Sequence, residues 1–487
     1  MNVCKIIIED EVNIKLEGLD IVTRRKCANA VKFFLPHARY SAAYKLGRWD
    51  GTQSYCTIGG RTYLNLLDKF MPLIQEDGYN FEIDDHRKPH KFEFDQIDEN
   101  VLSHRLWPEG HRNAGQPIVL RDYQVDIVNN CIKNLQGINI AATSAGKTIA
   151  TVTLSSLVEK YGRSIIIVPN TNLVQQTEED YKNVGLDVGV LYGDRKEYNR
   201  THTICTWQSL SILDKKSKDH LDDEQMEVFM KDLVCVIVDE CHAVKHLNVL
   251  QTMLTTTFSE VPIRWGLTGT LPEEEYQKIS LNCSIGPVIG ELTAYELQQQ
   301  GHIANCDITL YQTQETTKFG NYQSELKFLV TSQSRIDWMV ELIKETAKSG
   351  NTVILVDRIP TGELLHEQLP DSIFVSGSMK ASKRKEHYKD INVEENKILI
   401  ATYGVLSTGV SINRIFNLIL VEPGKSSTRV IQSIGRGLRK ADDKDKVEIH
   451  DISSICRFSK KHMNKRRELY KKAQYPFVLK KINYKGD

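Results

Sequence analysis

Short apolar runs recur along the middle of the chain and alternate with longer segments of mixed polarity. The runs are rich in Ile and Val and end in turn or motif residues, as buried strands do; they cover residues 137–142, 164–169, 233–238 and 264–267. Segments such as 148–160 and 172–183 have the length and composition of helices. Alternation of this kind predicts a parallel sheet that is covered by helices on both faces.

A second series of apolar runs lies beyond residue 305. Its members are again short and rich in Ile, Leu and Val, and they cover residues 352–356, 373–376, 397–402, 418–421 and 447–450. The segment 292–305 is typical of a helix that leaves the first series. We therefore predict an α/β protein with two lobes in tandem, the first over residues 116–305 and the second, with a basic tail, over 306–487.

The amino-terminal part differs from these lobes in its charge pattern. Residues 24–48 contain seven Lys or Arg and no acid, and aromatic residues are interleaved among them. The balance turns acidic and polar over residues 76–99, as in a solvated connection. These shifts predict a small α+β domain at residues 1–90 and a linker at residues 91–115.

Bulk composition limits the classes of function. The 487 residues carry 63 Lys and Arg against 63 Asp and Glu, so any nucleic-acid binding must come from local patches. The ten cysteines form no C-x-x-C pair. Cys235, Cys241 and His242 lie close together in sequence, but buried thiols in a reducing compartment explain them better than zinc does. No apolar stretch has membrane-spanning length and the amino terminus lacks a signal-peptide pattern, so we expect a soluble, cytoplasmic protein.

The first motif that carries chemistry directly follows the run at 137–142 and opens a helical segment. In that context backbone N–H groups and a helix amino terminus bind phosphate oxygens. Lys147 can reach the β- and γ-phosphates of a nucleotide, and the Thr148 hydroxyl can ligate Mg²⁺. Ala141 replaces the first glycine of the general P-loop pattern. The predicted nucleotide-binding loop comprises Ala142, Thr143, Ser144, Ala145, Gly146, Lys147 and Thr148.

The second motif is a pair of acids at the end of the run at 233–238. Ligands of open α/β sheets bind beyond the carboxyl ends of strands. We assign Asp239 to Mg²⁺ and Glu240 to the attacking water, because one carboxylate can hold the metal while its neighbour activates the nucleophile. The alternative is that these are two solvated acids at a strand end. A P-loop earlier in the chain argues against this alternative.

The third motif is the sequence QSIGRGLR at residues 432–439. Its two arginines, Arg436 and Arg439, are three residues apart and are expected on one face of a helix. If the second lobe closes on the first, their planar guanidinium groups can meet the γ-phosphate as arginine fingers. A basic surface helix is the alternative interpretation.

Together these motifs resemble superfamily-2 helicases, whose other motifs follow in order between residues 115 and 455. The resemblance implies two RecA-like lobes that hydrolyse ATP with Mg²⁺ while moving on nucleic acid. It implies adenine recognition by Arg121, Tyr123 and Gln124, and coupling of hydrolysis to movement by His242, Thr268, Thr270 and Gln432.

The resemblance also implies contacts with the nucleic-acid strand. These are carried by Pro169, Asn170, Thr206 and Thr402. Gly409, in the motif that follows Thr402, is implied to bind the nucleotide; in this motif the family often has an acid where this chain has Ser411.

A closer resemblance rests on the segment GRWDG at residues 47–51, on the TWQS and DECH motifs and on the chain length. These features resemble the phage UvsW-type recombination and repair helicases. That family implies ATP-dependent remodelling of branched DNA (Holliday junctions, stalled forks and R-loops) in recombination, repair and replication. It implies DNA as the partner, including single-stranded/duplex junctions and RNA–DNA hybrids, a monomeric state, and the host cytoplasm as location if the protein is phage-encoded.

Two basic segments are candidates for DNA contact. In the amino-terminal domain the predicted contacts are Arg24, Arg25, Lys26, Lys45 and Arg48, since cations interleaved with aromatic residues can bind phosphates and stack on bases. We expect Phe33 and Phe34 in the core of that domain. In the tail the candidates are Lys460, Lys461, Lys465, Arg466 and Arg467; the equally supported alternative is a helix packed on the second lobe with its cations solvated.

Three other functions fit parts of the pattern. An RNA helicase of the same superfamily would use the same motor motifs, because these contact the backbone. A duplex translocase without unwinding of its own could serve as a subunit of a restriction complex; the absence of a convincing nuclease motif argues only against a self-contained version. An annealing or binding module regulated by ATP would not need Glu240 together with both arginines.

Overall fold

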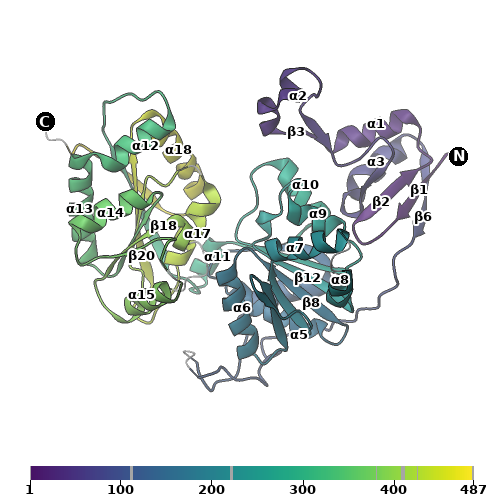
Figure 1. Cartoon of the computed structure of the whole chain (residues 1–487), viewed down its shortest axis with the longest axis horizontal. Coiled ribbons are helices and arrows are strands. Elements are labelled where there is room, and N and C mark those ends of the chain that lie inside the picture. Colours follow the sequence, from purple (N-terminus) through teal and green to yellow (C-terminus); the bar gives the residue numbers. More distant parts are fainter. Residues whose placement is uncertain are drawn as a thin grey trace. The chain divides into compact units, whose positions relative to one another are not determined.

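The computed structural model describes residues 2–109, 113–219, 223–379, 381–406, 412–424 and 426–484. Its internal contacts divide the chain into two units (Figure 1). The first unit contains Met1–Ile140 and Lys147–Glu291, and the second contains Ala141–Gly146 and Leu292–Asp487. Among the described residues, none of the helices combines the length and apolar character needed to cross a membrane.

A four-stranded sheet with order β5-β2-β1-β6 forms the amino-terminal part of the first unit. The strands are β1 (Asn2–Ile8), β2 (Asn13–Glu17), β5 (Arg61–Tyr63) and β6 (Tyr79–Asp85). Alternate side chains of β1 are buried, as one covered face requires. Helices α1 (Ile21–Ala30) and α3 (Leu67–Glu76) contribute Cys27, Phe70 and Ile74 to the same core.

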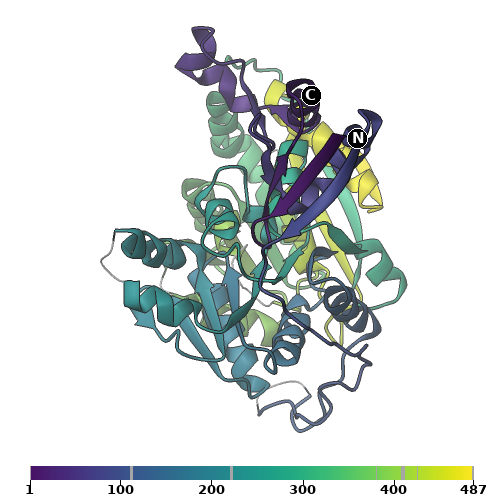
Figure 2. The same ribbon diagram turned by 90° about the vertical axis from the view of Figure 1, so that its right-hand side faces the viewer.

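An arm leaves this sheet between α1 and β5. Its stem is the antiparallel pair β3 (Lys32–Phe34) and β4 (Thr52–Ser54), and its tip carries η1 (Pro36–Tyr40) and α2 (Ala42–Lys45). In both views the tip extends away from the amino-terminal sheet (Figures 1 and 2).

The predicted burial of both phenylalanines in the arm is half correct. Phe33 packs against the amino-terminal core. Phe34 is 36% exposed, and its ring instead contacts Tyr44 at 5.7 Å and the Arg39 guanidinium at 5.5 Å. Because side chains alternate along a strand, the two neighbours cannot both face the same core. The prediction for Phe34 is therefore wrong.

The amino-terminal domain packs on the first lobe. Ile279 and Cys283 of helix α10 (Glu275–Ser284) belong to its hydrophobic core. Tyr55 is 5% exposed. Its hydroxyl donates a hydrogen bond to the Tyr276 carbonyl and contacts His246 Nδ1, both at 2.7 Å. These contacts explain why the domain and the first lobe fall into one unit.

The segment after β6 follows the surface of the first lobe instead of crossing solvent. The Phe94 ring contacts Tyr161 at 5.1 Å and Trp265 at 6.4 Å. The Asn129 side chain accepts a 2.9 Å hydrogen bond from the Ile97 N–H group. Regularly spaced aromatic residues thus anchor a stretch whose polarity had suggested a solvated connection.

The first lobe contains an eight-stranded sheet with order β10-β9-β11-β8-β12-β13-β7-β14. The bounds are β7 (Gln136–Ala141), β8 (Arg163–Val168), β9 (Val188–Tyr192), β10 (Arg195–Lys196), β11 (His202–Thr206), β12 (Leu233–Asp239), β13 (Ile263–Thr268) and β14 (Val288–Leu292). The strands from β9 to β7 in this order are parallel to their neighbours. Their carboxyl ends therefore share one edge.

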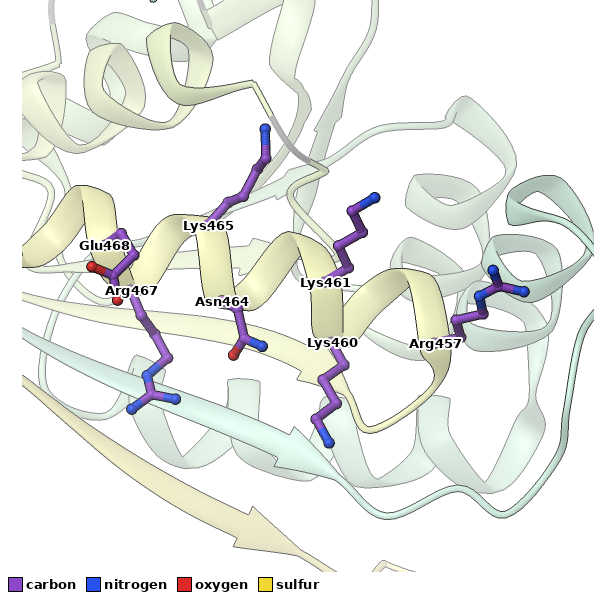
Figure 3. Close-up of a pocket in the computed structure, with 7 residues that line it drawn as sticks. All are labelled: Arg457, Lys460, Lys461, Asn464, Lys465, Arg467 and Glu468. Carbon is purple, nitrogen blue, oxygen red and sulfur yellow. The ribbon is translucent and has the colours of Figure 1, made fainter.

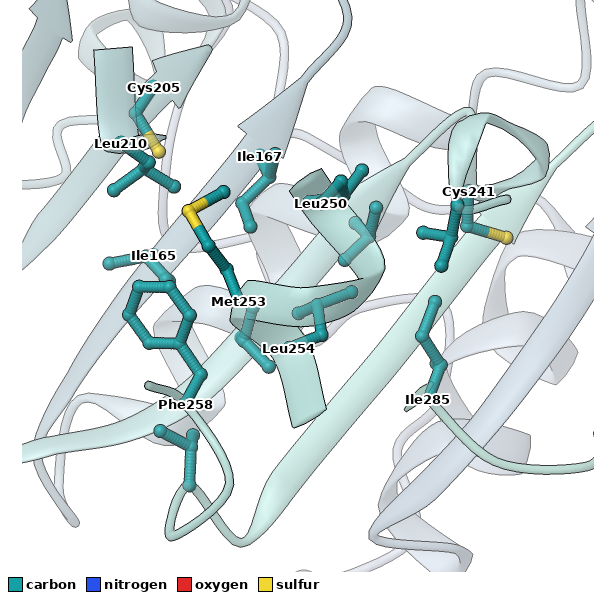
Figure 4. Packing of buried hydrophobic residues seen from close by; sticks show 14 of the residues in the cluster. Ile165, Ile167, Cys205, Leu210, Cys241, Leu250, Met253, Leu254, Phe258 and Ile285 are labelled. Atoms are coloured by element: carbon teal, nitrogen blue, oxygen red, sulfur yellow. The ribbon is translucent and has the colours of Figure 1, made fainter. Parts of the chain in front are cut away.

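Helices cover the sheet of the first lobe, and its core lies beneath them. The helices are α4 (Asp122–Lys133), α5 (Lys147–Val158), α6 (Thr171–Asn183), α7 (Trp207–Lys218), α8 (Asp223–Met230), α9 (Val249–Thr255) and α10. Ile165 and Ile167 of β8 pack with Leu250, Met253 and Phe258 (Figure 4). Ile166, between them, is equally buried but faces the other side, so both faces of this strand are covered, as predicted.

The second lobe contains a seven-stranded sheet with order β17-β18-β16-β19-β20-β15-β21, in which all neighbours are parallel. The bounds are β15 (Asn305–Thr313), β16 (Thr352–Val356), β17 (Ile373–Val375), β18 (Ile398–Thr402), β19 (Asn417–Val421), β20 (Lys446–Ser454) and β21 (Phe477–Ile482). The helices are α11 (Ala294–Gln299), α12 (Tyr322–Thr331), α13 (Gln333–Ala347), α14 (Ile359–Gln368), α15 (Ala381–Val393), α16 (Tyr403–Leu406), α17 (Ser427–Gly437) and α18 (Arg457–Lys472). The predicted α/β class with two parallel-sheet lobes is confirmed.

Candidate nucleotide site and nucleic-acid surfaces

Lys147 and Glu240 face each other at the carboxyl edge of the first sheet. Lys147 is the first residue of α5, which follows β7, and Glu240 directly follows β12. Because β7 and β12 both pair in parallel with β13, their ends lie at the same edge. Lys147 Nζ lies 4.0 Å from Glu240 Oε1, and both side chains are largely shielded from solvent. The lysine and the second acid of the two motifs are thus brought together.

The backbone of Glu240 has an unusual conformation. Its φ is 50° and its ψ is 48°, the left-handed region that residues other than glycine rarely adopt. Such strain is concentrated at functional sites, where the surrounding structure maintains it. The turn at Glu240 leads into η3 (Cys241–Ala243) and brings the His242 ring back toward the Glu240 carboxylate.

Asp239 lies deeper in the same site. Its Oδ1 accepts a 2.9 Å hydrogen bond from the Glu240 N–H group. Burial and the adjacent Glu240 carboxylate raise the pKa of Asp239 to about 6, although the Lys147 ammonium opposes the shift. A perturbed carboxyl at the end of a central strand is typical of a functional site.

His242 connects the acids to the end of β13. Its Nδ1 lies 2.9 Å from Thr268 Oγ1 and 3.3 Å from Glu240 Oε2. Thr268 Oγ1 donates its one proton to the Thr270 carbonyl at 2.9 Å, so it must accept from His242, and Nδ1 carries a proton. Glu240, His242 and Thr268 therefore form one series, an ion-pair contact followed by a hydrogen bond, that links three of the predicted site residues.

The three residues predicted to read adenine support one another at the start of α4. The Arg121 N–H group donates to Gln124 Oε1 at 2.9 Å, and Arg121 Nη1 donates to the Tyr123 hydroxyl at 2.6 Å. Gln124 is 6% exposed. The hydrogen bond from the Arg121 backbone to the Gln124 side chain fixes both the helix start and the orientation of the glutamine.

The remaining loop residues, 141–146, belong to the second unit. Ser144 has a φ of 75° and donates from Oγ to the Gly435 carbonyl at 2.7 Å. Arg439 Nε lies 3.4 Å from the same Ser144 Oγ. Within this unit the predicted arginine-finger segment thus lies beside the phosphate-binding loop.

The expectation that Arg436 and Arg439 share one helical face is wrong. Helix α17, which also carries Gln432, ends at Gly437, so Arg436 lies in its last turn and Arg439 beyond it. The buried Lys444 side chain donates to the Gly437 and Arg439 carbonyls and closes this end of the helix. No motif in the sequence singles out Lys444. Gly409 lies outside the described residues.

The donor atoms available for a metal are the Thr148 hydroxyl and the Asp239 carboxylate. Both are hard oxygen donors, which suit Mg²⁺ when nucleotide phosphates and water complete its shell. In the part of the chain that the structure describes, no group of three or more His, Cys, Asp or Glu is placed to hold a metal by itself. Cys235 and Cys241 are buried free thiols.

The predicted strand-contacting residues lie at strand ends, where they also cap helices. Asn170, after Pro169, accepts from the Leu173 N–H group at 3.1 Å at the start of α6. Thr206, 5% exposed, accepts from the Ser209 N–H group at 3.3 Å at the start of α7. Thr402 is the last residue of β18 in the second lobe.

The basic residues of the amino-terminal domain differ in availability. Arg25, Lys45 and Arg48 are exposed, the last two at the tip of the arm. Lys26 is also exposed but forms an ion pair with Asp77, whereas Arg24 is half-buried. Two exposed apolar side chains accompany the cations of the tip: Tyr40 is 81% and Leu46 64% exposed.

Arg466 does not point toward solvent as a phosphate contact would require. It is 2% exposed, and its Nε and Nη2 each donate to the Asp451 carboxylate at 2.7 Å. Tyr470, one turn later, donates to the same carboxylate at 2.8 Å. The interpretation of Arg466 as a solvent-facing cation is therefore wrong, because the helix period turns this residue toward the sheet.

Comparisons with known proteins agree with this arrangement of motifs. Residues 117–273 match the family described as type III restriction enzyme, res subunit, and residues 334–441 match the helicase conserved C-terminal domain. The chain is similar to the ATP-dependent DNA helicase uvsW of Enterobacteria phage T4, with 23% identity over 88% of this chain and 86% of the relative. It is also similar to the DNA 3'-5' translocase XPB2 of Sulfurisphaera tokodaii, with 26% identity over 63% of this chain and 64% of the relative.

Among solved structures, a fragment of a type I restriction-enzyme HsdR subunit from Vibrio vulnificus shares the fold. Its TM-score is 0.57 at 17% identity, and the match covers 97% of this chain and 85% of the other. The two matched families cover the two lobes in order, and the pairing of Lys147 with the Glu240 and His242 series lies within the first. The chain therefore belongs to the superfamily-2 helicases, which hydrolyse ATP.

Proposed function

We propose that this helicase is a DNA motor that remodels branched junctions, and that its amino-terminal domain grips duplex DNA beside the ATP site. The observation that carries the proposal is that the domain with the basic arm packs on the lobe that contains Lys147 and Glu240. Its core includes Ile279 and Cys283 of that lobe, and Tyr55 bonds to Tyr276. A grip on DNA would thus be built into the body that binds ATP.

The proposal is also supported by similarity to the phage T4 relative, described as an ATP-dependent DNA helicase, which extends over 86% of its length and so beyond the two motor lobes. The substrates implied by this family are Holliday junctions, stalled forks and R-loops. In this proposal the enzyme has the four parts expected from the sequence: the amino-terminal domain, the connecting segment and the two lobes.

In the proposed cycle ATP binds with its adenine at Gln124 and its phosphates at the loop of residues 142–148. Lys147 neutralises charge on the β- and γ-phosphates. When bound through Thr148 and Asp239, Mg²⁺ would supply further charge neutralisation at these phosphates. Glu240 accepts a proton from the water that attacks the γ-phosphorus, and the bond from that phosphorus to the ADP oxygen breaks.

Coupling in this proposal passes through the Glu240, His242 and Thr268 series. A change in charge at Glu240 alters the 3.3 Å contact to His242 Nδ1, which also holds Thr268 at 2.9 Å. Thr270 accepts from Thr268 and would report the change to the loop after β13. Arg436 and Arg439 would sense the γ-phosphate, with Gln432 on the same helix as Arg436.

DNA contacts are assigned to two groups of residues. Pro169, Asn170, Thr206 and Thr402 would hold one strand at the carboxyl edges of the sheets. Arg25, Lys45 and Arg48, helped by Arg24 and Lys26, would hold duplex phosphates. Lys26 contributes less than the others because Asp77 already neutralises it.

The test is the rate of ATP hydrolysis with no nucleic acid, linear single-stranded DNA, a four-way DNA junction and matched RNA. We expect the highest rate with the junction. Glu240→Gln should retain ATP binding and lose about 10²–10⁴-fold in turnover, because it removes the general base. The control is Glu341→Gln, an exposed carboxylate paired with Lys344 in the other unit. Stimulation of ATP hydrolysis by RNA alone would identify the chain as an RNA helicase. Normal turnover of Glu240→Gln would refute the assignment of Glu240 as the general base.

A further inference from the structure

Helix α18 presents a continuous basic surface that the motor motifs do not use. Five cations lie along it: Arg457, Lys460, Lys461, Lys465 and Arg467, which we call the α18 ridge. They line a shallow, open hollow together with Asn464 and Glu468 (Figure 3), and the Glu468 carboxylate lies within ion-pair distance of Lys471. Among the residues that the structure describes, none of the five has a carboxylate within ion-pair distance. Other exposed lysines of this lobe do form ion pairs, for example Lys446 with Asp307 and Glu448.

The ridge is held firmly to the second lobe by the opposite face of the helix. Arg466 and Tyr470 bond to the buried Asp451 of β20, and Met463 is 1% exposed. The first turn of the helix is fixed as well: the Glu325 carboxylate accepts from the N–H groups of Phe458 at 2.9 Å and Ser459 at 2.7 Å. A helix with this anchorage presents its cations in a defined order.

The arrangement of the cations fits two lines of negative charge. Lys461 and Lys465 extend from one side of the helix, and Lys460 and Arg467 from the other (Figure 3). At about 100° per residue these pairs are separated by well over a quarter turn. The residues that fall between them are Arg457, Asn464 and Glu468. From Arg457 to Arg467 the ridge is about 15 Å long at 1.5 Å per residue.

Duplex DNA has matching features. Its two phosphate lines border grooves, and the major groove, about 12 Å wide, admits an α-helix. A single strand offers only one such line. The side chains between the two pairs of cations are polar: Asn464 is neutral, and the Glu468 carboxylate lies 3.2 Å from Lys471. Lysines on flexible stems also suit sequence-independent contact with phosphates.

We propose that the α18 ridge is a second duplex-binding surface, separate from the motor motifs and from the amino-terminal domain, which contacts the phosphate backbones of both strands. The inference rests on the proposed function as a DNA motor. The ridge would keep the second lobe on the duplex while the strand contacts of the motor are released during the ATP cycle.

The test uses the full-length chain with the triple substitution Lys460→Ala, Lys461→Ala and Lys465→Ala. Binding to a fluorescent 30-base-pair duplex and to a single strand of the same length is measured by anisotropy over a series of salt concentrations; at 3.4 Å per base pair the duplex is about seven times as long as the ridge. We expect the slope of log affinity against log salt on duplex to fall by about 2–3, since each phosphate contact contributes about 0.9. ATPase turnover at saturating duplex should stay within twofold of wild type.

The matched control removes three paired lysines of the same unit, Lys344, Lys348 and Lys446, each within ion-pair distance of a glutamate. It should leave the slope unchanged. Replacing the three ridge lysines by arginine should also preserve it, which separates loss of charge from damage to the fold.

If the slope of log affinity against log salt on duplex is the same for the triple variant and for wild type, the proposal is overturned. The ridge would then be a candidate site for an acidic protein partner. A loss confined to the single strand would overturn the assignment to duplex. Failure of the proposed function looks different: the wild-type ATPase would then show no stimulation by any DNA, whereas the slope difference between wild type and the triple variant is measured without ATP.

Discussion

Replacing Arg466 by methionine distinguishes an internal anchor from a DNA contact. The guanidinium makes two 2.7 Å hydrogen bonds to Asp451, and a third, at 2.9 Å, to the Gly424 carbonyl. Asp451 has no exposed surface. Removal of the arginine leaves a buried carboxylate with only hydroxyl donors, Tyr470 at 2.8 Å and Ser453 at 3.1 Å.

The expected cost follows from that geometry. Breaking a buried ion pair by removing one partner costs about 3–5 kcal/mol. For a lobe of this size each kcal/mol lowers the melting temperature by about 2–4 °C, so the transition of the second lobe should fall by about 6–20 °C. The double variant Arg466→Met with Asp451→Leu should recover much of the loss, because it removes the unpaired charge.

The adjacent residue supplies the control. Arg467 is half-buried, has no ion-pair partner among the described residues and belongs to the α18 ridge. Arg467→Met should change the free energy of unfolding by less than about 1 kcal/mol and weaken duplex binding. The assay is calorimetry of the full chain, with duplex affinity measured in parallel. A shift below about 2 °C for Arg466→Met, with a large loss of duplex affinity, would refute the reasoning and restore Arg466 as a surface cation.

Three further substitutions test other contacts. Tyr55→Phe removes the hydroxyl that donates to the Tyr276 carbonyl and contacts His246 Nδ1, and it should lower the free energy of unfolding of the first unit by about 1–3 kcal/mol in urea titrations; no change would mean that the domain docks otherwise. Burial lowers the pKa of His450 from 6.5 to about 4, so the unfolded chain binds a proton first, and stability should fall by up to about 3 kcal/mol as pH decreases from 6.5 to 4. His450→Phe should flatten that pH profile, and an unaltered profile would contradict the assignment. Thr268→Val removes the acceptor of His242 and should reduce stimulation of the ATPase by DNA about fivefold or more while basal hydrolysis persists; an unchanged ratio of the two rates would exclude the series from coupling.

Most central strands, and the motifs expected to bind phosphate, could be recognised from local sequence patterns. Every apolar run singled out in the sequence overlaps a strand, for example 164–169 with β8 and 447–450 with β20. Central parallel strands are buried on both faces, so they appear as unbroken apolar runs. Strands such as β9, β11 and β21 were not predicted, because glycine, threonine or lysine interrupts their apolar character.

The positions of individual side chains near the site could not be predicted as well from the sequence. Lys444 closes the end of α17 from a position that no motif marks. Phe34 and Arg466 were both placed wrongly, since the face on which a residue of a short strand or a helix lies depends on register and not on residue type. Likewise, the acidic stretch near residue 90 gave no sign that Phe94 would anchor it to Tyr161.

The sequence by itself determined the class of the fold and the order of the lobes, and it predicted the residues that handle phosphate. These depend on short-range spacing: a turn between a strand and a helix needs particular residues wherever it occurs. Only the tertiary structure decided which of these residues meet. Lys147 comes within 4.0 Å of Glu240 because β7 and β12 lie on either side of β13. It also decided which cations of α18 face solvent and which one is buried, because that depends on what the helix packs against, and residues distant in the sequence supply that surface.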